Sequence, residues 1–139
     1  MGEIGMRCTV SAFPNGRAKK RRGGARIARR STIVDALVDT GAVEILLPRD
    51  LVRSLGLQIF GRAPVTLADD RQVTMPVAGP LWIIAFGRQM VTDCLVGPAG
   101  CEPLVGQIVL ERLDLILDAK KRTIRPRLKT GPVLKLKST

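Results

Sequence analysis

The stretch Leu37-Val38-Asp39-Thr40-Gly41-Ala42 places a carboxylate directly after two strand-forming apolar residues and at the start of a glycine turn. We expect this aspartate to end a buried strand, where its surroundings can control its ionisation. The chain of 139 residues contains no histidine, so the side chain most often used as a general base is missing. Asp39 is therefore the leading candidate for any chemistry that this protein performs.

The composition predicts one domain with a modest core of aliphatic side chains, because aromatic residues make up only 3% of the 139 residues. Three scattered cysteines, Cys8, Cys94 and Cys101, are too few for a disulfide framework or a zinc site, and we expect Cys94 to be a buried free thiol. No apolar stretch has the length of a signal peptide or a membrane span. We therefore expect a cytoplasmic protein without a cofactor or metal.

The net charge of +11 is unevenly distributed along the chain. Residues 17–30 carry eight basic side chains and no acidic one, and so do residues 119–139. Residues 31–118 carry six basic and eleven acidic side chains, which gives this segment a net charge of −5. Basic segments can bind nucleic acid by releasing counterions. A solvated tail is the plainer alternative, and it is favoured because no aromatic residue is interleaved with the basic ones.

Short alternating apolar segments predict an all-β fold, closed or sandwich-like, with one or two short helices after Pro48 and Gly106. Two hairpins are expected, with the strand pairs Ala63–Leu67 and Gln72–Val77, and Leu81–Phe86 and Met90–Val96. The other predicted strands are Arg7–Phe13, Thr32–Val38, Ala42–Leu47, Leu115–Asp118, Thr123–Leu128 and Val133–Lys137.

A faint internal repeat accompanies this pattern. Leu47-Pro48 and the helical segment after it resemble Pro103-Leu104 and the helical segment that follows Gly106. This suggests two similar half-domains whose helices turn their leucines toward the core. We also expect Trp82, on an apolar strand, to lie in the core.

Asp39 can catalyse hydrolysis well only with a second carboxylate. Two aspartates within hydrogen-bond distance share one proton, because like charges so close cannot both ionise. The ionised member then takes a proton from water while the protonated member donates to the substrate carbonyl. The chain has one Asp-Thr-Gly sequence, so a two-fold homodimer would have to supply the second Asp39.

Two sequence blocks together resemble the retropepsin-like aspartic proteases, and most closely their small single-domain prokaryotic type. The first is residues 35–42, and the second is Pro103-Leu104-Val105-Gly106 followed by Leu110 and Leu113. The resemblance covers about residues 32–128 and implies a closed acid-protease barrel, with one lobe per chain. Residues 1–31 would then form an N-terminal strand and a basic flexible loop, and residues 129–139 a basic tail or interface strand.

This resemblance implies a homodimeric aspartic endopeptidase that hydrolyses peptide bonds with a water activated between two Asp39 carboxylates. Thr40 would bond across the dimer axis, and Gly41 would permit the turn and donate its N–H toward the carboxylate. The hairpin around residues 67–74 would act as a flap over the substrate. The implied substrate-binding residues are Ala42, Leu67, Ala68, Asp69, Val105 and Gly106.

The sequence departs from the family pattern at several positions. Ala42 lacks the hydroxyl that pepsin-like enzymes place there to stabilise the ionised aspartate, so we expect a pH optimum less acidic than that of a pepsin. Val43 and Gln107 stand where retroviral members commonly carry a paired acid and arginine, so the support of the loop must differ. Asp70 replaces a glycine at the flap tip, a position that an aspartate tolerates.

An alternative function belongs to another class. The chain would be a catalytically inactive dimeric β-barrel module that binds nucleic acid or a protein partner through residues 17–30 and 119–137. In this interpretation Asp39 only caps a turn, and Asp69 and Asp70 form a solvated turn.

Overall fold

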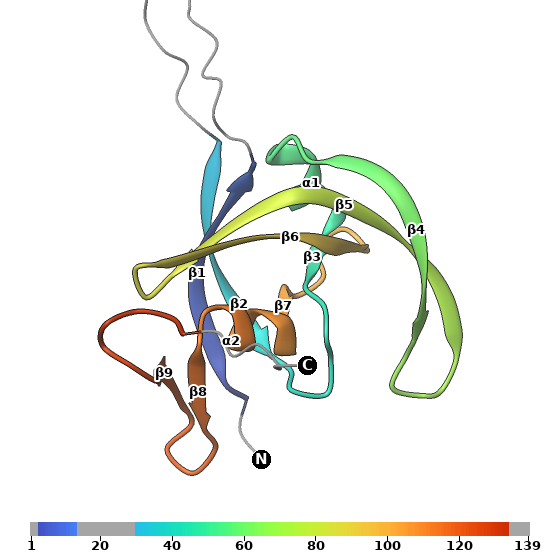
Figure 1. Ribbon diagram of the computed structural model, residues 1–139. Helices are drawn as coiled ribbons and strands as arrows, with labels where there is room; N and C mark the ends of the chain where they lie inside the picture. The colour runs from blue at the N-terminus through green and yellow to red at the C-terminus, as the bar shows by residue number, and fades with distance from the viewer. Residues whose placement is uncertain (1–2, 14–29, 134–139) are drawn as a thin grey trace, which may run out of the picture.

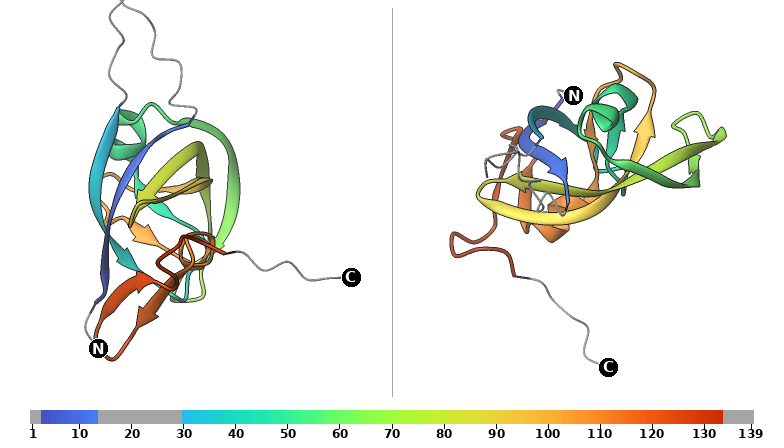
Figure 2. Two further views of the ribbon diagram at one scale, coloured as in Figure 1. Left: turned by 60° about the vertical axis from the view of Figure 1, so that its left-hand side comes forward. Right: turned by 90° about the horizontal axis from the view of Figure 1, so that it is seen from above.

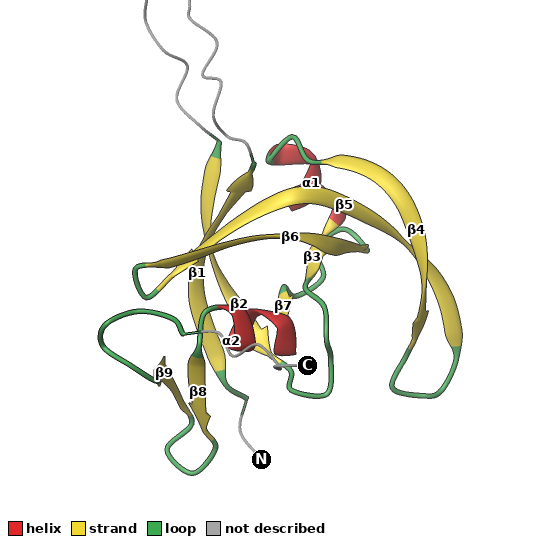
Figure 3. Ribbon diagram, viewed as in Figure 1, coloured by secondary structure: helices red, strands yellow, loops and turns green. Residues whose placement is uncertain are grey.

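The computed structural model describes residues 3–13 and 30–133. It confirms a fold that is mostly β-sheet with two short helices (Figure 3). The predicted basic loop at 14–30, except Arg30, and the predicted strand at 133–137, except Val133, lie outside the described residues. Neither described helix is long and apolar enough to cross a membrane.

Seven strands form the main sheet and two form a separate pair. The main-sheet strands are β1 (Gly5–Ala12), β2 (Ser31–Val38), β3 (Leu46–Pro48), β4 (Gln58–Thr66), β5 (Gln72–Ala85), β6 (Arg88–Gly97) and β7 (Leu104–Val105). The separate pair is β8 (Leu115–Asp118) and β9 (Thr123–Pro126), and the helices are α1 (Arg49–Ser54) and α2 (Gln107–Arg112). The order of the main sheet is β1-β2-β7-β3-β6-β5-β4, and β1 also pairs with β5 (Figure 1).

The N-terminal strand is an integral part of the main sheet. On one side β1 runs antiparallel to β2, from Gly5 opposite Leu37 to Ser11 opposite Ser31. On the other side its C-terminal half pairs antiparallel with β5, where Ala12 lies opposite Leu81. In the order β1-β2-β7-β3-β6-β5, the last strand therefore pairs with β1 again.

The centre of the sheet contains the internal repeat that the sequence suggests. β3 and β7 run antiparallel, with Leu46 opposite Leu104. β3 is parallel to β6, and β7 is parallel to β2. The unit β2–β3–α1 therefore repeats as β6–β7–α2, since in each a long strand, a connecting loop and a short strand precede a helix of 6 residues. This arrangement brings the loop after Asp39 against the start of α2.

Two predicted elements differ from those observed. β5 is continuous over 14 residues, although the sequence predicts separate strands on either side of Pro80. Proline is accommodated because the pairing with β6 shifts register between Ala78 and Leu81, where the ladder is already interrupted. β3 spans only Leu46–Pro48 rather than residues 42–47, since the backbone before it turns toward α2 instead of continuing the sheet.

The core is aliphatic, as the composition predicts. Its largest fully buried side chains are Ile45, Leu47, Leu81, Ile83, Leu113, Val10, Val105, Val109 and Cys94. Cys94 is a buried free thiol, and burial raises its pKa to about 12. Trp82 is only half-buried, on the face of β5 opposite Leu81 and Ile83, so its predicted place in the core is wrong. Its ring lies edge-on against Phe13 with ring centres 5.8 Å apart, and its Nε1 donates to Gln89 Oε1.

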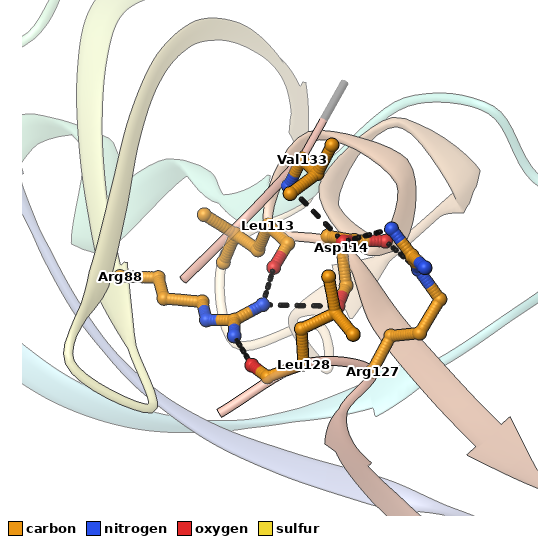
Figure 4. Close-up of polar contacts among 6 residues, drawn as sticks. All are labelled: Arg88, Leu113, Asp114, Arg127, Leu128 and Val133. Atoms are coloured by element: carbon orange, nitrogen blue, oxygen red, sulfur yellow. Dashed lines mark hydrogen bonds and ion pairs between the residues drawn. The ribbon is translucent and has the colours of Figure 1, made fainter. Parts of the chain in front are cut away.

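A buried arginine ties the separate strand pair to the main sheet (Figure 4). Arg88 is 7% exposed and its Nη1 donates to the carbonyl oxygens of Leu113 at 2.8 Å and Asp114 at 3.0 Å. Its Nη2 donates to the carbonyl oxygen of Leu128. Asp114 in turn forms a two-point ion pair with Arg127, with both distances 2.8 Å. One guanidinium thus holds the chain both before β8 and after β9.

We predict that the Asp114–Arg127 pair makes the fold sensitive to acid. Hydrogen bonds from Arg127, and next from the Val133 N–H, hold the pKa of Asp114 below its usual value. Because the folded-state pKa is lowered, the carboxylate stabilises the fold above its unfolded pKa of about 3.9, and this contribution is lost as the pH falls through the folded-state pKa. Asp114→Asn keeps the residue size and tolerates the observed φ of 54°. At pH 7 its Tm should lie below that of the wild type, and the gap should narrow toward pH 2. An equal gap at every pH would contradict this prediction.

Candidate active site

Asp39 lies directly after β2, and three hydrogen bonds fix its position, two between backbone groups and one to its carboxylate. Its own N–H donates to the Val105 carbonyl at 2.9 Å, and its carbonyl accepts from the Ala42 N–H at 3.1 Å. The Gly41 N–H donates to Asp39 Oδ1 at 2.9 Å, which is the bond expected from the sequence. The loop therefore sets the direction of the carboxylate before any substrate arrives.

The surroundings of Asp39 differ from those expected. Asp39, Thr40 and Gly41 are all exposed on the single chain. Only Ala36 of β2 is buried, so the prediction that Asp39 ends a buried strand is wrong. The apolar residues before Asp39 indicated a strand correctly, but they did not indicate that one face of that strand is exposed.

The start of α2 supports the loop after Asp39. The backbone N–H groups of Gln107 and Ile108 donate to the carbonyls of Ala42 at 2.8 Å and Val43 at 3.0 Å, respectively. The first N–H groups of a helix have no partner within the helix, so they are available for such bonds. The Gln107 side chain adds a bond from its Nε2 to the Thr40 carbonyl at 3.1 Å. The neutral side chain of Gln107 thus supports the loop directly, although the sequence indicated only that an acid–arginine pair is missing at positions 43 and 107.

Gly106 lets α2 approach this loop closely. A Cβ at position 106 would lie 2.5 Å from the Glu44 carbonyl oxygen and 2.6 Å from those of Ala42 and Val43. Any larger residue would push the loop away. Val105, which is 2% exposed, and Gly106 are buried beneath the loop, and neither lines the cleft beside it. Their role in substrate binding, which the resemblance implies, stays a prediction.

A cleft of about 710 Å³ lies between the Asp39 loop and the hairpin of β4 and β5. Three of the predicted substrate-binding residues line this cleft, namely Ala42, Leu67 and Ala68. From the sequence we did not predict the four lining residues of β4, Val43 and Glu44 of the loop, or Leu95 of β6. Glu44 was detectable from its place near the Asp-Thr-Gly sequence, whereas nothing local marks Leu95. The cleft-lining residues are Asp39, Gly41, Ala42, Val43, Glu44, Ala63, Pro64, Val65, Thr66, Leu67, Ala68, Asp70 and Leu95.

The tip of the β4–β5 hairpin projects away from the other strands (Figure 2, right). The turn is closed by a bond from the Leu67 N–H to the Arg71 carbonyl at 2.8 Å. Asp70 has a φ of 65°, the left-handed conformation expected where a glycine would be usual. Asp69 does not line the cleft, because its carboxylate bonds Arg71 Nε at 2.6 Å within the turn. Asp70 lines the cleft in its place.

The cleft has a negative charge. Asp39, Glu44 and Asp70 line it, and no lysine or arginine does so among the described residues. Its remaining lining is mainly small and aliphatic. In the described part of the chain, no three acidic, cysteine or histidine side chains come together as a metal site. The arrangement offers a positioned carboxylate, an apolar groove and a hairpin that borders it.

Neither a protein-family model nor a curated protein matches the sequence. Among solved structures, the chain is similar to the retroviral protease-like domain of Ddi1 from Leishmania major. The match has a TM-score of 0.56 and 16% sequence identity, and it covers 97% of this chain and 96% of that chain. At this level of identity the similarity shows the fold, which is that of a retroviral protease-like domain.

Replacing Gly106 with alanine should destabilise the fold, because the new methyl group would meet three backbone oxygens that cannot move independently. Overpacking of this kind costs about 1–3 kcal/mol. Gly61→Ala is the matched control, since a Cβ there has nothing within 4 Å. Urea unfolding should give a lower midpoint for G106A and little change for G61A. Similar midpoints for both variants would show that the loop does not rest on α2 as described.

Proposed function

We propose that this protein is an aspartic endopeptidase that acts as a homodimer. The observation that carries the proposal is the Asp39 carboxylate, oriented by the Gly41 N–H at 2.9 Å and opening into a cleft of about 710 Å³. The retroviral protease-like fold supports it at the level of architecture. The proposed form of this fold is the closed acid-protease barrel with one lobe per chain.

The dimer follows from the chemistry of a single carboxylate. One chain supplies one Asp-Thr-Gly loop, and this loop is exposed. A two-fold axis through the loop would bring a second Asp39 to the first, with Thr40 of each chain bonding across the axis. Exposure of these residues in one chain is compatible with such an interface, because a second copy would cover them.

In the proposed reaction, the two Asp39 carboxylates share one proton. The ionised carboxylate removes a proton from water as the water attacks the peptide carbonyl, and the protonated carboxylate donates to the carbonyl oxygen. The carboxylate that removed the proton from water then gives it to the leaving amine, and the diol returns one hydroxyl proton to the other carboxylate as the C–N bond breaks. The products are an amine and a carboxylic acid, and the pair again shares one proton. The Gly41 N–H holds one carboxylate oxygen in place, and the β4–β5 hairpin would close over the peptide and exclude water.

Asp39→Asn tests the proposed catalytic role directly. Removing the ionisable group should reduce peptide cleavage by about 10³-fold or more, the upper part of the range for general acid–base catalysis. The variant should keep its Tm and its dimeric mass in light scattering, since Asn can still accept the Gly41 N–H. The assay uses a mixed peptide library from about pH 3 to 8, which spans carboxylate-dyad values. A wild-type protein that cleaves nothing over this range would refute the proposal.

The negative cleft predicts a preference for basic substrates. Peptides with lysine beside the scissile bond should be cleaved with a higher kcat/KM than matched peptides with glutamate. Glu44→Gln should reduce the ratio of kcat/KM for the lysine peptide to kcat/KM for the glutamate peptide. The expected reduction is about two- to five-fold, the effect of one exposed charge pair. Glu111→Gln, an exposed position on α2 that does not line the cleft, is the matched control. An equal change in both variants would indicate a general charge effect instead of a contact in the cleft.

A further inference from the structure

A second cavity lies at the far end of β5 from the candidate active site. It has a volume of about 480 Å³ and lies between the β5–β6 turn and the segment that includes β9. β5 begins at the flap hairpin and ends at this cavity, and its 14 residues span up to about 45 Å. We call this cavity the cationic pocket, and its lining residues are Phe86, Arg88, Arg125, Pro126, Arg127 and Lys129.

Four of the six lining residues are cations and none is acidic. Arg88 and Arg127 are held in place by their bonds to the backbone and to Asp114 (Figure 4). In residues 3–13 and 30–133, Arg125 and Lys129 take part in no ion pair. The pocket therefore combines two fixed guanidinium groups with two further cations whose charge is not neutralised, which is an environment for an anionic ligand.

Three of the cations come from β9 and the residues just after it. From residue 123 to 129 the chain alternates between exposed and half-buried positions. Arg125 lies in β9, whereas Arg127 and Lys129 follow it in a bend and a turn, and all three are exposed and line the same pocket. Ile124 packs against the core on the opposite side and holds this segment in place.

Phe86 adds an aromatic surface to the pocket. Its side chain is 47% exposed, and its backbone has a φ of 54° beside Gly87 with a φ of 72°. Two consecutive positive φ values are typical of a tight hairpin turn, where asparagine and glycine fold best. A bulky residue there costs about 1 kcal/mol. The turn thus keeps an exposed aromatic ring at a position where local stability favours asparagine.

We propose that the cationic pocket binds single-stranded nucleic acid, with a base stacked on Phe86 and phosphates on Arg125 and Lys129. Stacking on an aromatic ring next to cations is how proteins bind single strands without sequence preference. Next to β9 along the chain, the β8–β9 turn carries three more exposed cations, Lys120, Lys121 and Arg122, and no acidic residue follows Asp118 in the sequence. This number of cations in one segment favours a polynucleotide, which has many phosphates, over a single nucleotide.

This proposal is independent of the proposed proteolysis. The sequence favoured a solvated tail because no aromatic residue is interleaved with the basic ones. The fold supplies that residue from a different hairpin, since Phe86 follows β5 and lies beside the basic segment. Asp39→Asn should therefore leave nucleic-acid binding unchanged, whatever its effect on peptide cleavage.

The test is fluorescence anisotropy with a labelled 20-nucleotide oligo(dT), at 50 and 200 mM salt, with full-length protein. Phe86→Asn should keep or raise the Tm and weaken binding about five- to 100-fold, the value of one stacked base. Arg125→Gln and Lys129→Gln should each reduce the salt slope by about 0.7. Arg53→Gln, an exposed arginine of α1 outside the pocket, is the matched control and should change affinity less.

Four results would overturn the proposal. The first is no binding of oligo(dT) at 50 mM salt. The second is an equal loss in F86N, R125Q and R53Q, which would indicate diffuse charge attraction through any basic segment. The third is equal affinity for oligo(dT) and for a DNA duplex of the same length, which would exclude stacking of a base on Phe86. The fourth is competition by thymidine monophosphate at the same concentration as the oligonucleotide, which would make the ligand a single nucleotide.

Discussion

The close contact between the start of α2 and the loop after Asp39 is the constraint on which the candidate site depends. Two backbone N–H groups and the Gln107 side-chain amide donate to three carbonyls of the loop, at residues 40, 42 and 43. This is possible only because Gly106 has no side chain. The helix is held at the core by Val109 and Leu113, which are both fully buried. Core packing thus sets the position of an exposed carboxylate through one helix terminus.

The internal repeat explains why such a contact exists. Because β2–β3 and β6–β7 cross the centre of the sheet in the same way, the loop after β2 and the start of α2 meet at the same place. Directly after its long strand, one unit carries an aspartate, Asp39 after β2, whereas the other carries Pro98 after β6. This other unit supplies the helix that supports Asp39. One half of the chain therefore presents the reactive group, and the other half fixes it.

Much of this architecture could be predicted from the sequence, because short-range patterns encode it. The alternation of apolar residues indicated the strands, and Pro48 and Gly106 marked the starts of the two helices. The continuity of β5 through Pro80 could not be predicted, since it depends on a register shift opposite β6. The exposure of Asp39 was also missed, because a local pattern does not report which face of β2 is covered. Leu95 reaches the cleft through the pairing of β6 with β3 and β5, and the β5–β6 turn that carries Phe86 meets the basic segment through the hydrogen bonds of Arg88. A local sequence pattern reports neither.

The register of β1 and β2 has a consequence for how this chain accommodates change. Ser11 lies opposite Ser31 at one end of the pair, and Asp39 follows the other end. An eight-residue strand, about 26 Å long, separates the β1–β2 connection from the reactive loop. The entropic cost of closing a connection grows only slowly with its length, by about 0.6 kcal/mol for each doubling. β1 is held by β5 as well as by β2, so the position of the carboxylate depends on these two strand ladders and little on the length of the chain that joins β1 to β2.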